Sequence, residues 1–201
     1  MPDTNASLEK LRSTYPHDVK LSDGASANLR IFSKSDKDAV INFARNLPED
    51  DLLFLRVDIT EPAVVDNWIA NVEAGIALSI VAYDDEGVAG YATVDRNPAR
   101  WTRRVGEIRV NVAPRCRAKG LGRHLTAQIF DIARTLDLRK LMANMTIDQI
   151  GAQAAFKRLG FMPEALLADY VEDRNGDARD LVIMSYDVEG FTDQVDEPIH
   201  L

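Results

Sequence analysis

The stretch EIRVNVAPRCRAKGLGR (residues 107–123) decides how the rest of the chain is interpreted. Polar and apolar side chains alternate over residues 107–112, which predicts a β-strand with one polar and one apolar face. From Gly120 the apolar residues change to helical spacing and predict a helix of about 18 residues. A strand, a glycine loop and a helix N-terminus together favour an anion, because the first amides of a helix lack partners within it.

The charge around this stretch agrees with an anionic ligand. The chain holds 24 Lys and Arg against 32 Asp and Glu, a net charge of −8. This balance argues against general binding to nucleic acid or to a membrane surface. Eight of the 24 cations nevertheless lie within residues 100–123, where Glu107 is the one acid. The basic stretch beside the glycines therefore favours a phosphate group.

Two common phosphate-binding motifs fit the glycines less well. A Walker loop has Lys and Ser or Thr after its last glycine, whereas Lys119 precedes Gly120 here. A dinucleotide fingerprint starting at Gly120 would need a glycine where Leu125 stands and an acid where Asn144 stands. A dinucleotide-binding oxidoreductase is therefore only a third hypothesis.

A longer pattern carries a resemblance to a known family. Arg117-x-x-Gly120-x-Gly122, preceded by Glu107-x-x-Val110-x-Val112-x-Pro114, resembles the acetyl-CoA signature of the GNAT superfamily of N-acetyltransferases in its bacterial form. A predicted helix over residues 149–158, followed by Leu-Gly-Phe at 159–161, is similar to the second conserved block of that family. The resemblance extends over residues 29–186, which is most of the chain.

The resemblance implies transfer of an acetyl group from acetyl-CoA to a primary amine by direct attack. It also implies that the pyrophosphate binds backbone amides of the loop and that the pantetheine arm lies beside the strand like an added strand. A backbone N–H near Val110 would polarise the thioester carbonyl, and Glu107 matches the position of a general base. The residues that the resemblance assigns to the cosubstrate are Val110, Val112, Arg117, Ala118, Lys119, Gly120, Leu121, Gly122, Arg123 and Gln149. No metal is expected.

One departure from the family pattern leaves the activity open. Aligned on Gly160 and Phe161, the chain has Phe156 where the family usually places the tyrosine that protonates the leaving thiolate. Solvent or Tyr170 would then take that role. The alternative is a catalytically silent GNAT-like module that binds acyl-CoA as a sensor or as an interaction surface.

Some of the candidate site residues also have purely structural interpretations. Glu107 could be a strand carboxylate paired with Arg104 or Arg109. Gln149 could act only as the capping-box partner of Thr146. Cys116 has no accompanying His and Asp pattern, so we expect an inert thiol.

The remaining elements complete a single α/β domain. Strands are expected at residues 28–32, 76–83, 88–94, 107–112, 140–145, 163–170 and 181–186, and helices at 35–46, at about 60–73, from Gly120, and from Thr146 to Gly160. With the resemblance, this order predicts the GNAT fold, a mixed, mostly antiparallel, splayed sheet of about seven strands with helices on both faces. We expect an N-terminal extension at 1–27, the acetyltransferase domain at 28–189 and a polar C-terminal tail at 190–201.

Composition also bears on location and partners. The single cysteine fits a reducing compartment. The longest apolar run, residues 74–83, is too short to span a membrane, and residues 1–10 are polar and lack the features of a secretory leader. We therefore expect a cytoplasmic protein without nucleic-acid or membrane partners. The acceptor is a small-molecule or peptide amine of open identity, and a homodimer is one possible assembly.

Overall fold

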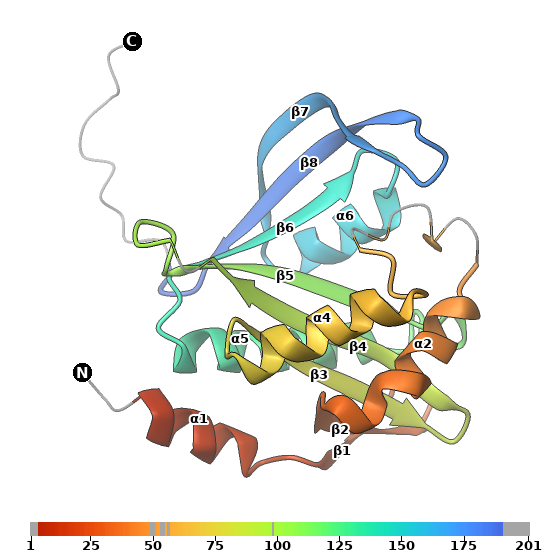
Figure 1. The fold of residues 1–201 in the computed structure, drawn as a ribbon, viewed down its shortest axis with the longest axis vertical. Helices are drawn as coiled ribbons and strands as arrows, with labels where there is room; N and C mark the ends of the chain where they lie inside the picture. The colour runs from red at the N-terminus through yellow and green to blue at the C-terminus, as the bar shows by residue number, and fades with distance from the viewer. Residues whose placement is uncertain (1–3, 49–50, 53–54, 56, 98, 191–201) are drawn as a thin grey trace.

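The computed structural model describes residues 4–48, 51–52, 55, 57–97 and 99–190. Its elements in chain order are α1 (Thr4–Arg12), β1 (His17–Lys20), β2 (Ser26–Ile31), the 3₁₀ helix η1 (Lys34–Asp36), α2 (Lys37–Arg45), α4 (Pro62–Glu73), β3 (Ala77–Asp84), β4 (Gly87–Arg96), β5 (Val105–Val112), the 3₁₀ helix η2 (Pro114–Cys116), α5 (Leu121–Thr135), β6 (Lys140–Thr146), α6 (Ile150–Arg158), β7 (Met162–Glu172) and β8 (Ala178–Asp187). Figure 1 shows their arrangement.

The strands of this described part form one sheet in the order β1-β2-β3-β4-β5-β6-β8-β7. Neighbouring strands are antiparallel except β5 and β6, which are parallel. The predicted mixed and mostly antiparallel sheet is confirmed, with eight strands where about seven were expected. The additional strand is β1.

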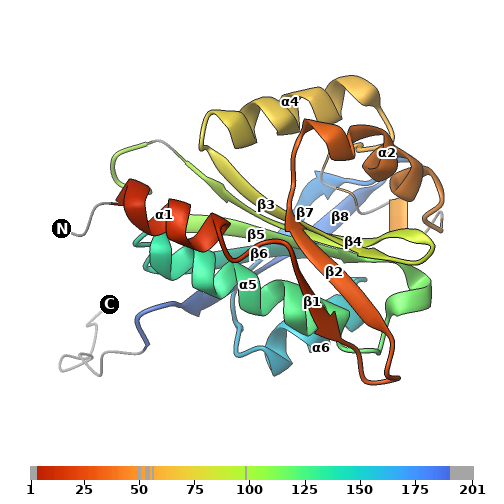
Figure 2. The same ribbon diagram turned by 90° about the horizontal axis from the view of Figure 1, so that it is seen from below.

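Strand β1 lies within the segment that the sequence predicts as an N-terminal extension. It pairs with β2 from His17 opposite Leu29 to Lys20 opposite Ser26, so the sheet begins before residue 28. Helix α1 lies beside α5 (Figure 2), and the Tyr15 hydroxyl donates a hydrogen bond of 2.6 Å to Gln128 of α5. This segment is therefore part of the folded domain. Residues 191–201 of the predicted tail lie outside the described residues.

The helices cover both faces of the sheet, as predicted (Figure 2). Helices α1, α5 and α6 lie on one face, and α2 and α4 lie on the other. The stripe of α5 is fully buried: Leu121, Leu125, Ile129 and Ile132 are all 0% exposed. None of the described helices has the length and apolar character that crossing a membrane requires.

Helix α5 has 15 residues, fewer than the 18 or so predicted. Asp137 has a φ of 55°, so it occupies the left-handed position that ends many helices. The amides of Asp137 and Leu138 donate back to the carbonyls of Arg134 and Ala133 at 3.1 and 2.9 Å. These two hydrogen bonds end the helix at a left-handed aspartate. The predicted helix is too long because the sequence has no glycine there to mark its end.

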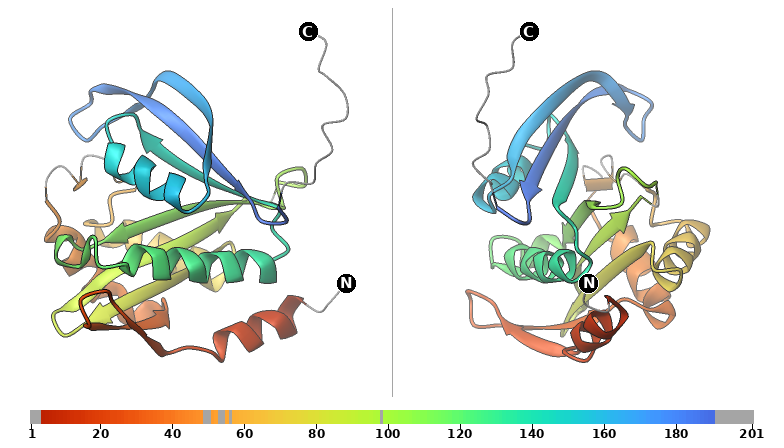
Figure 3. Two further views of the ribbon diagram at one scale, coloured as in Figure 1. Left: turned by 180° about the vertical axis from the view of Figure 1, so that it is seen from behind. Right: turned by 90° about the vertical axis from the view of Figure 1, so that its left-hand side faces the viewer.

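The sheet forks between β5 and β6. These two strands pair over only three residues each, from Val105 opposite Lys140 to Glu107 opposite Met142. Beyond Glu107, within the described residues, β5 continues against β4 and β6 continues against β8. Figure 3 shows the arm of β6, β8 and β7 turning away from the arm of β1 to β5. The predicted splay is therefore a fork that opens after Glu107.

Close backbone packing in the larger arm gives a stability prediction. A Cβ added at Gly90 of β4 would lie 2.6 Å from the carbonyl oxygen of Asn111 and 3.2 Å from Cα of Val112. We expect Gly90→Ala to force β4 and β5 apart and to lower the free energy of unfolding by about 1–3 kcal/mol. Chemical denaturation measures the change. Gly151→Ala is the control, because no heavy atom lies within 4 Å of an added Cβ at that site in α6. Equal midpoints for the two variants would contradict this prediction.

Candidate functional site

The loop between β5 and α5 turns through two left-handed residues before the helix begins. Ala118 and Gly120 both have left-handed backbones, with φ of 58° and 90°, and Gly120 is the N-cap of α5. No heavy atom lies within 4 Å of a Cβ built at Gly120, so glycine is favoured there by its backbone angle. At Gly122 an added Cβ would lie 3.6 Å from Cγ2 of Val112, so the first turn of α5 approaches the end of β5.

The first amides of α5 are available to a ligand. The first hydrogen bond within the helix runs from the His124 amide to the Gly120 carbonyl, at 3.1 Å. The amides of Leu121, Gly122 and Arg123 precede it and therefore have no carbonyl partner in the helix. The buried Leu121 side chain fixes the helix on the core, while Gly120 and Arg123 are exposed. These amides and the helix dipole favour an anion at this point.

The two predicted cations of the loop are paired with acids from distant segments. Arg117 forms an ion pair with Asp51 at 2.5 Å, and its Nε donates to the Val112 carbonyl at 3.2 Å. Lys119 pairs with Asp23 at 2.9 Å, and this hydrogen bond raises the pKa of Lys119 and lowers that of Asp23. The charges of Arg117 and Lys119 are therefore offset within the fold. The backbone amides at the start of α5 remain as donors for an anion.

The turn between β1 and β2 supports this loop. The Ser22 amide donates to the Lys119 carbonyl at 3.0 Å, and Asp23 holds the Lys119 side chain. His124 Nε2 lies 3.1 Å from the Lys20 carbonyl. The sequence did not predict these contacts of the β1–β2 turn, because no local pattern in a short polar turn indicates a partner about 100 residues away.

Cys116 is a structural residue beside the loop. Its side chain is 4% exposed, and its Sγ donates to Asp84 at 3.2 Å. Burial and this hydrogen bond raise the pKa of Cys116 to about 11, so the thiol is protonated at neutral pH, which agrees with the inert thiol predicted. Arg115 holds the same carboxylate through Nε and Nη2 at 3.0 and 2.8 Å. No group of three potential metal ligands was found among the described residues.

The open edge of β5 continues from the loop towards the fork. The Ala113 amide donates to the Ala89 carbonyl across from it, at 2.8 Å. Because backbone groups alternate in direction along an antiparallel strand, Asn111 and Arg109 bond towards β4, whereas Val110 and Val112 direct N–H and C=O towards the gap. The contact between Arg117 and the Val112 carbonyl agrees with this direction. Val110 and Val112 therefore present the edge that the sequence predicts for an extended ligand.

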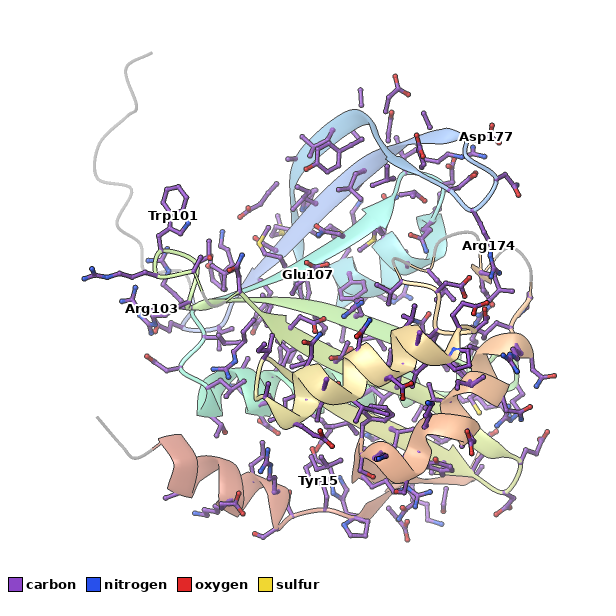
Figure 4. All side chains as sticks on the ribbon, viewed as in Figure 1. Tyr15, Trp101, Arg103, Glu107, Arg174 and Asp177 are labelled. Atoms are coloured by element: carbon purple, nitrogen blue, oxygen red, sulfur yellow. The ribbon has the colours of Figure 1, made fainter. Side chains whose placement is uncertain are left out.

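Glu107 lies at the fork on the polar face of β5, as predicted. Val110 and Val112 pack on the α5 side, whereas Asn111 donates to the Tyr91 hydroxyl at 2.7 Å on the opposite face. Glu107 shares the face of Asn111, is partly buried and stands opposite Asp95 on β4. Figure 4 shows it near the centre of the molecule, where β5 and β6 diverge.

The two arginines considered as partners of Glu107 each have other acids. Arg109 forms an ion pair with Asp95, and Arg104 pairs with Asp137 at 2.9 Å and with Glu189. Each arginine is therefore paired with at least one acid other than Glu107.

The predicted capping box at α6 is only half formed. The Gln149 side chain accepts a hydrogen bond of 3.0 Å from the Thr146 amide, but the buried Thr146 Oγ1 has no partner in the described structure. Gln149 is the N-cap, so α6 begins at Ile150, later than the box predicted. The Oε1 atom of Gln149 therefore already accepts a hydrogen bond at the end of β6.

The structure does not bring a tyrosine to the open edge from the predicted positions. Phe156, at the position of the family tyrosine, packs edge-on against Phe161 with ring centroids 4.9 Å apart. Tyr170 is 64% exposed on β7, and β8 and β6 separate that strand from β5 in the sheet. The candidate role of Tyr170 gains no support from this placement.

Comparison with known proteins identifies the family. Residues 41–161 match the model of the acetyltransferase (GNAT) family, and the chain belongs to this family. A search of curated proteins found no match.

Solved structures show the same fold. The ribosomal-protein-alanine N-acetyltransferase from Brucella melitensis is 22% identical over 79% of this chain and 98% of its own, with a TM-score of 0.68. Salmonella typhimurium yncA, solved with its cofactor acetyl-CoA, is 20% identical over 82% and 95% of the two chains, with a TM-score of 0.70. The GNAT domain of S. lividans PAT is 16% identical over 87% and 98%, also with a TM-score of 0.70.

Proposed function

We propose that this GNAT-family chain transfers an acetyl group from acetyl-CoA to a primary amine. The observation that carries the proposal is the arrangement along β5: available amides of α5 at one end, an open strand edge, and a carboxylate at the fork. Val112 and Glu107 are five residues apart, or roughly 17 Å along an extended strand. An extended cosubstrate with phosphates at one end and a thioester at the other matches this order.

The amides of Leu121, Gly122 and Arg123 would bind the pyrophosphate. The backbone groups of Val110 and the N–H of Val112 would pair with the amide groups of the pantetheine arm, as in the addition of a strand to a sheet edge. The Val110 N–H would then polarise the thioester carbonyl as negative charge develops on its oxygen. The chain thus acts mainly by orienting two substrates.

Glu107 is the proposed general base. The amine nitrogen attacks the thioester carbon, the C–S bond breaks, and the CoA thiolate leaves. Glu107, directly or through one water, takes the proton that the amine loses. The Phe156 side chain has no acidic group to protonate the thiolate, so solvent protonates the CoA thiolate after it leaves.

That same phenylalanine favours a second candidate function. A GNAT-like module that binds acyl-CoA without turnover, as a sensor or an interaction surface, has no need of an acid near the sulfur. A turnover assay that detects free CoA thiol over a panel of amines separates the candidates. Substrate-dependent thiol release supports the transferase, whereas binding without release supports the silent module.

The acceptor is proposed to be a small-molecule or peptide amine. The ribosomal-protein-alanine N-acetyltransferase among the similar folds supports nitrogen as the acceptor atom. The single cysteine of the chain supports a cytoplasmic reaction.

A loop variant tests cosubstrate binding. Gly122→Asp places a carboxylate on the first turn of α5, where it would repel the pyrophosphate. Calorimetry should show loss of CoA binding, and circular dichroism should show an intact fold. Gly151→Asp, which adds the same side chain to the start of α6, is the control for the added charge. Unchanged CoA affinity in folded Gly122→Asp would overturn the proposed phosphate site.

A second variant tests whether Asp51 competes with the cosubstrate for Arg117. If a phosphate must share this guanidinium, Asp51→Asn should tighten CoA binding by about two- to fivefold, the range for one exposed ion pair. The control is Asp66→Asn, because Asp66 pairs with Lys37 of α2 at 2.5 Å in a contact that does not include the loop. Weaker or unchanged CoA binding in Asp51→Asn would show that Arg117 is not a phosphate ligand.

Substitution of Glu107 tests the general base. A primary ammonium has a pKa of about 10.4, so the free amine is scarce at neutral pH, and a positioned base adds about 10²- to 10⁴-fold in rate. Glu107→Gln should retain acetyl-CoA affinity, reduce kcat at pH 7 within that range, and recover part of the rate as the pH approaches the pKa of the amine. A pH–rate profile that coincides with the parent profile would assign Glu107 a structural role.

A further inference from the structure

An exposed tryptophan marks the end of the sheet that the proposed reaction does not use. Trp101 lies in the connection between β4 and β5, and its side chain is 89% exposed. Tryptophan is normally among the more buried side chains. Figure 4 shows Trp101 and Arg103 projecting from one end of the molecule, opposite the end where Arg174 lies.

Arginines surround this tryptophan. Trp101, Arg103, Arg104, Val105 and Arg139 line a surface cavity of about 270 Å³, here named the Trp101 surface. Arg104 is neutralised by Asp137 and Glu189. Within the described residues, no ion pair joins Arg103 or Arg139 to an acid. Arg103 and Arg139 therefore present two cations without a described acidic partner, on a protein with a net charge of −8.

Backbone hydrogen bonds hold the Trp101 surface in place. The Val105 amide donates to the Thr102 carbonyl at 2.9 Å, which closes the turn before β5. The Arg139 amide donates to the Arg104 carbonyl at 2.7 Å, which joins the two segments that carry the arginines. Little ordering of the backbone would therefore oppose binding of a partner.

We propose that the Trp101 surface docks an acidic polypeptide segment of a partner protein. Tryptophan and arginine are the residue types that most often dominate the energy of protein interfaces. The planar guanidinium groups of Arg103 and Arg139 pair with carboxylates in a fixed geometry, and the projecting indole buries against an apolar side chain between them.

Charge distribution favours a peptide over a nucleic acid. The acids Asp137 and Glu189 are exposed at the edge of this surface and the whole chain is negative, so a dense polyanion is repelled beyond the local contact. A short segment with a few carboxylates needs only the local arginines. Val105 and Val112 are opposite ends of β5, so the surface is separate from the proposed phosphate loop.

The test uses the full chain and a labelled synthetic peptide. The probe is a fluorescein-labelled peptide of about ten residues, glutamates around a central phenylalanine, followed by fluorescence anisotropy at low salt. Trp101→Ala should weaken its binding by about tenfold or more, and Arg103→Glu with Arg139→Glu should abolish it. Lys157→Glu, which reverses an exposed charge in the last turn of α6, should bind as the parent does. Because Trp101 is exposed, the variants should keep the parent melting temperature and CoA affinity.

Three outcomes would overturn the proposal. Undiminished peptide binding by Trp101→Ala would show that the indole takes no part. Tighter binding of a single-stranded oligonucleotide, lost in the same variants, would assign the surface to nucleic acid. Absence of peptide binding to the folded parent chain would show that the Trp101 surface does not dock acidic polypeptide segments. None of these outcomes depends on whether the chain is an active transferase.

Discussion

The three-residue pairing between β5 and β6 is the constraint on which the site depends. Each strand remains paired on its other side, β5 with β4 from Gly106 to Val112 and β6 with β8 along its whole length, so the sheet can open without losing either arm. The opening leaves the N–H and C=O of Val110 and the N–H of Val112 directed into the gap, and such groups require partners from solvent or a ligand. The Val112 carbonyl already accepts a hydrogen bond from Arg117. Because the fork begins at Glu107, the carboxylate and the open edge lie on the same strand in a fixed order.

Acids from distant segments pair with two cations of the loop between β5 and α5. Asp51 follows α2, and Asp23 lies between β1 and β2, yet each neutralises a cation next to the glycines. These carboxylates stand where an anion would compete for Arg117 and Lys119. In the proposed site, these charged side chains would adjust the affinity for the cosubstrate, while the amides and the dipole of α5, which have no such competitor in the helix, would bind the anion itself.

Local patterns predicted the parts of the site that local physics determines. The alternation in residues 107–112, the two glycines and the stripe of α5 each reflect a short-range rule, and the structure confirms them. Strand β1 was missed because His17-Asp-Val-Lys20 contains one apolar residue and gives no alternation to detect. The partners Asp51 and Asp23 were missed because ion pairs across the chain have no spacing rule. The capping box at Thr146 was overestimated because only one of its two hydrogen bonds forms.

The basic stretch of the sequence also divides in space. Arg103 and Arg104 precede β5, whereas Arg115, Arg117 and Lys119 follow it. The eight residues of β5 extend for roughly 25 Å between them, well beyond the screening length of about 8 Å at physiological salt. Each cluster therefore contributes little to the electrostatic potential at the other. A phosphate bound at α5 would not neutralise the cations beside Trp101. The single basic segment of the sequence is therefore two separate surfaces at opposite ends of β5, and these three cations after the strand, unlike Arg103 before it, are each paired with an acid among the described residues.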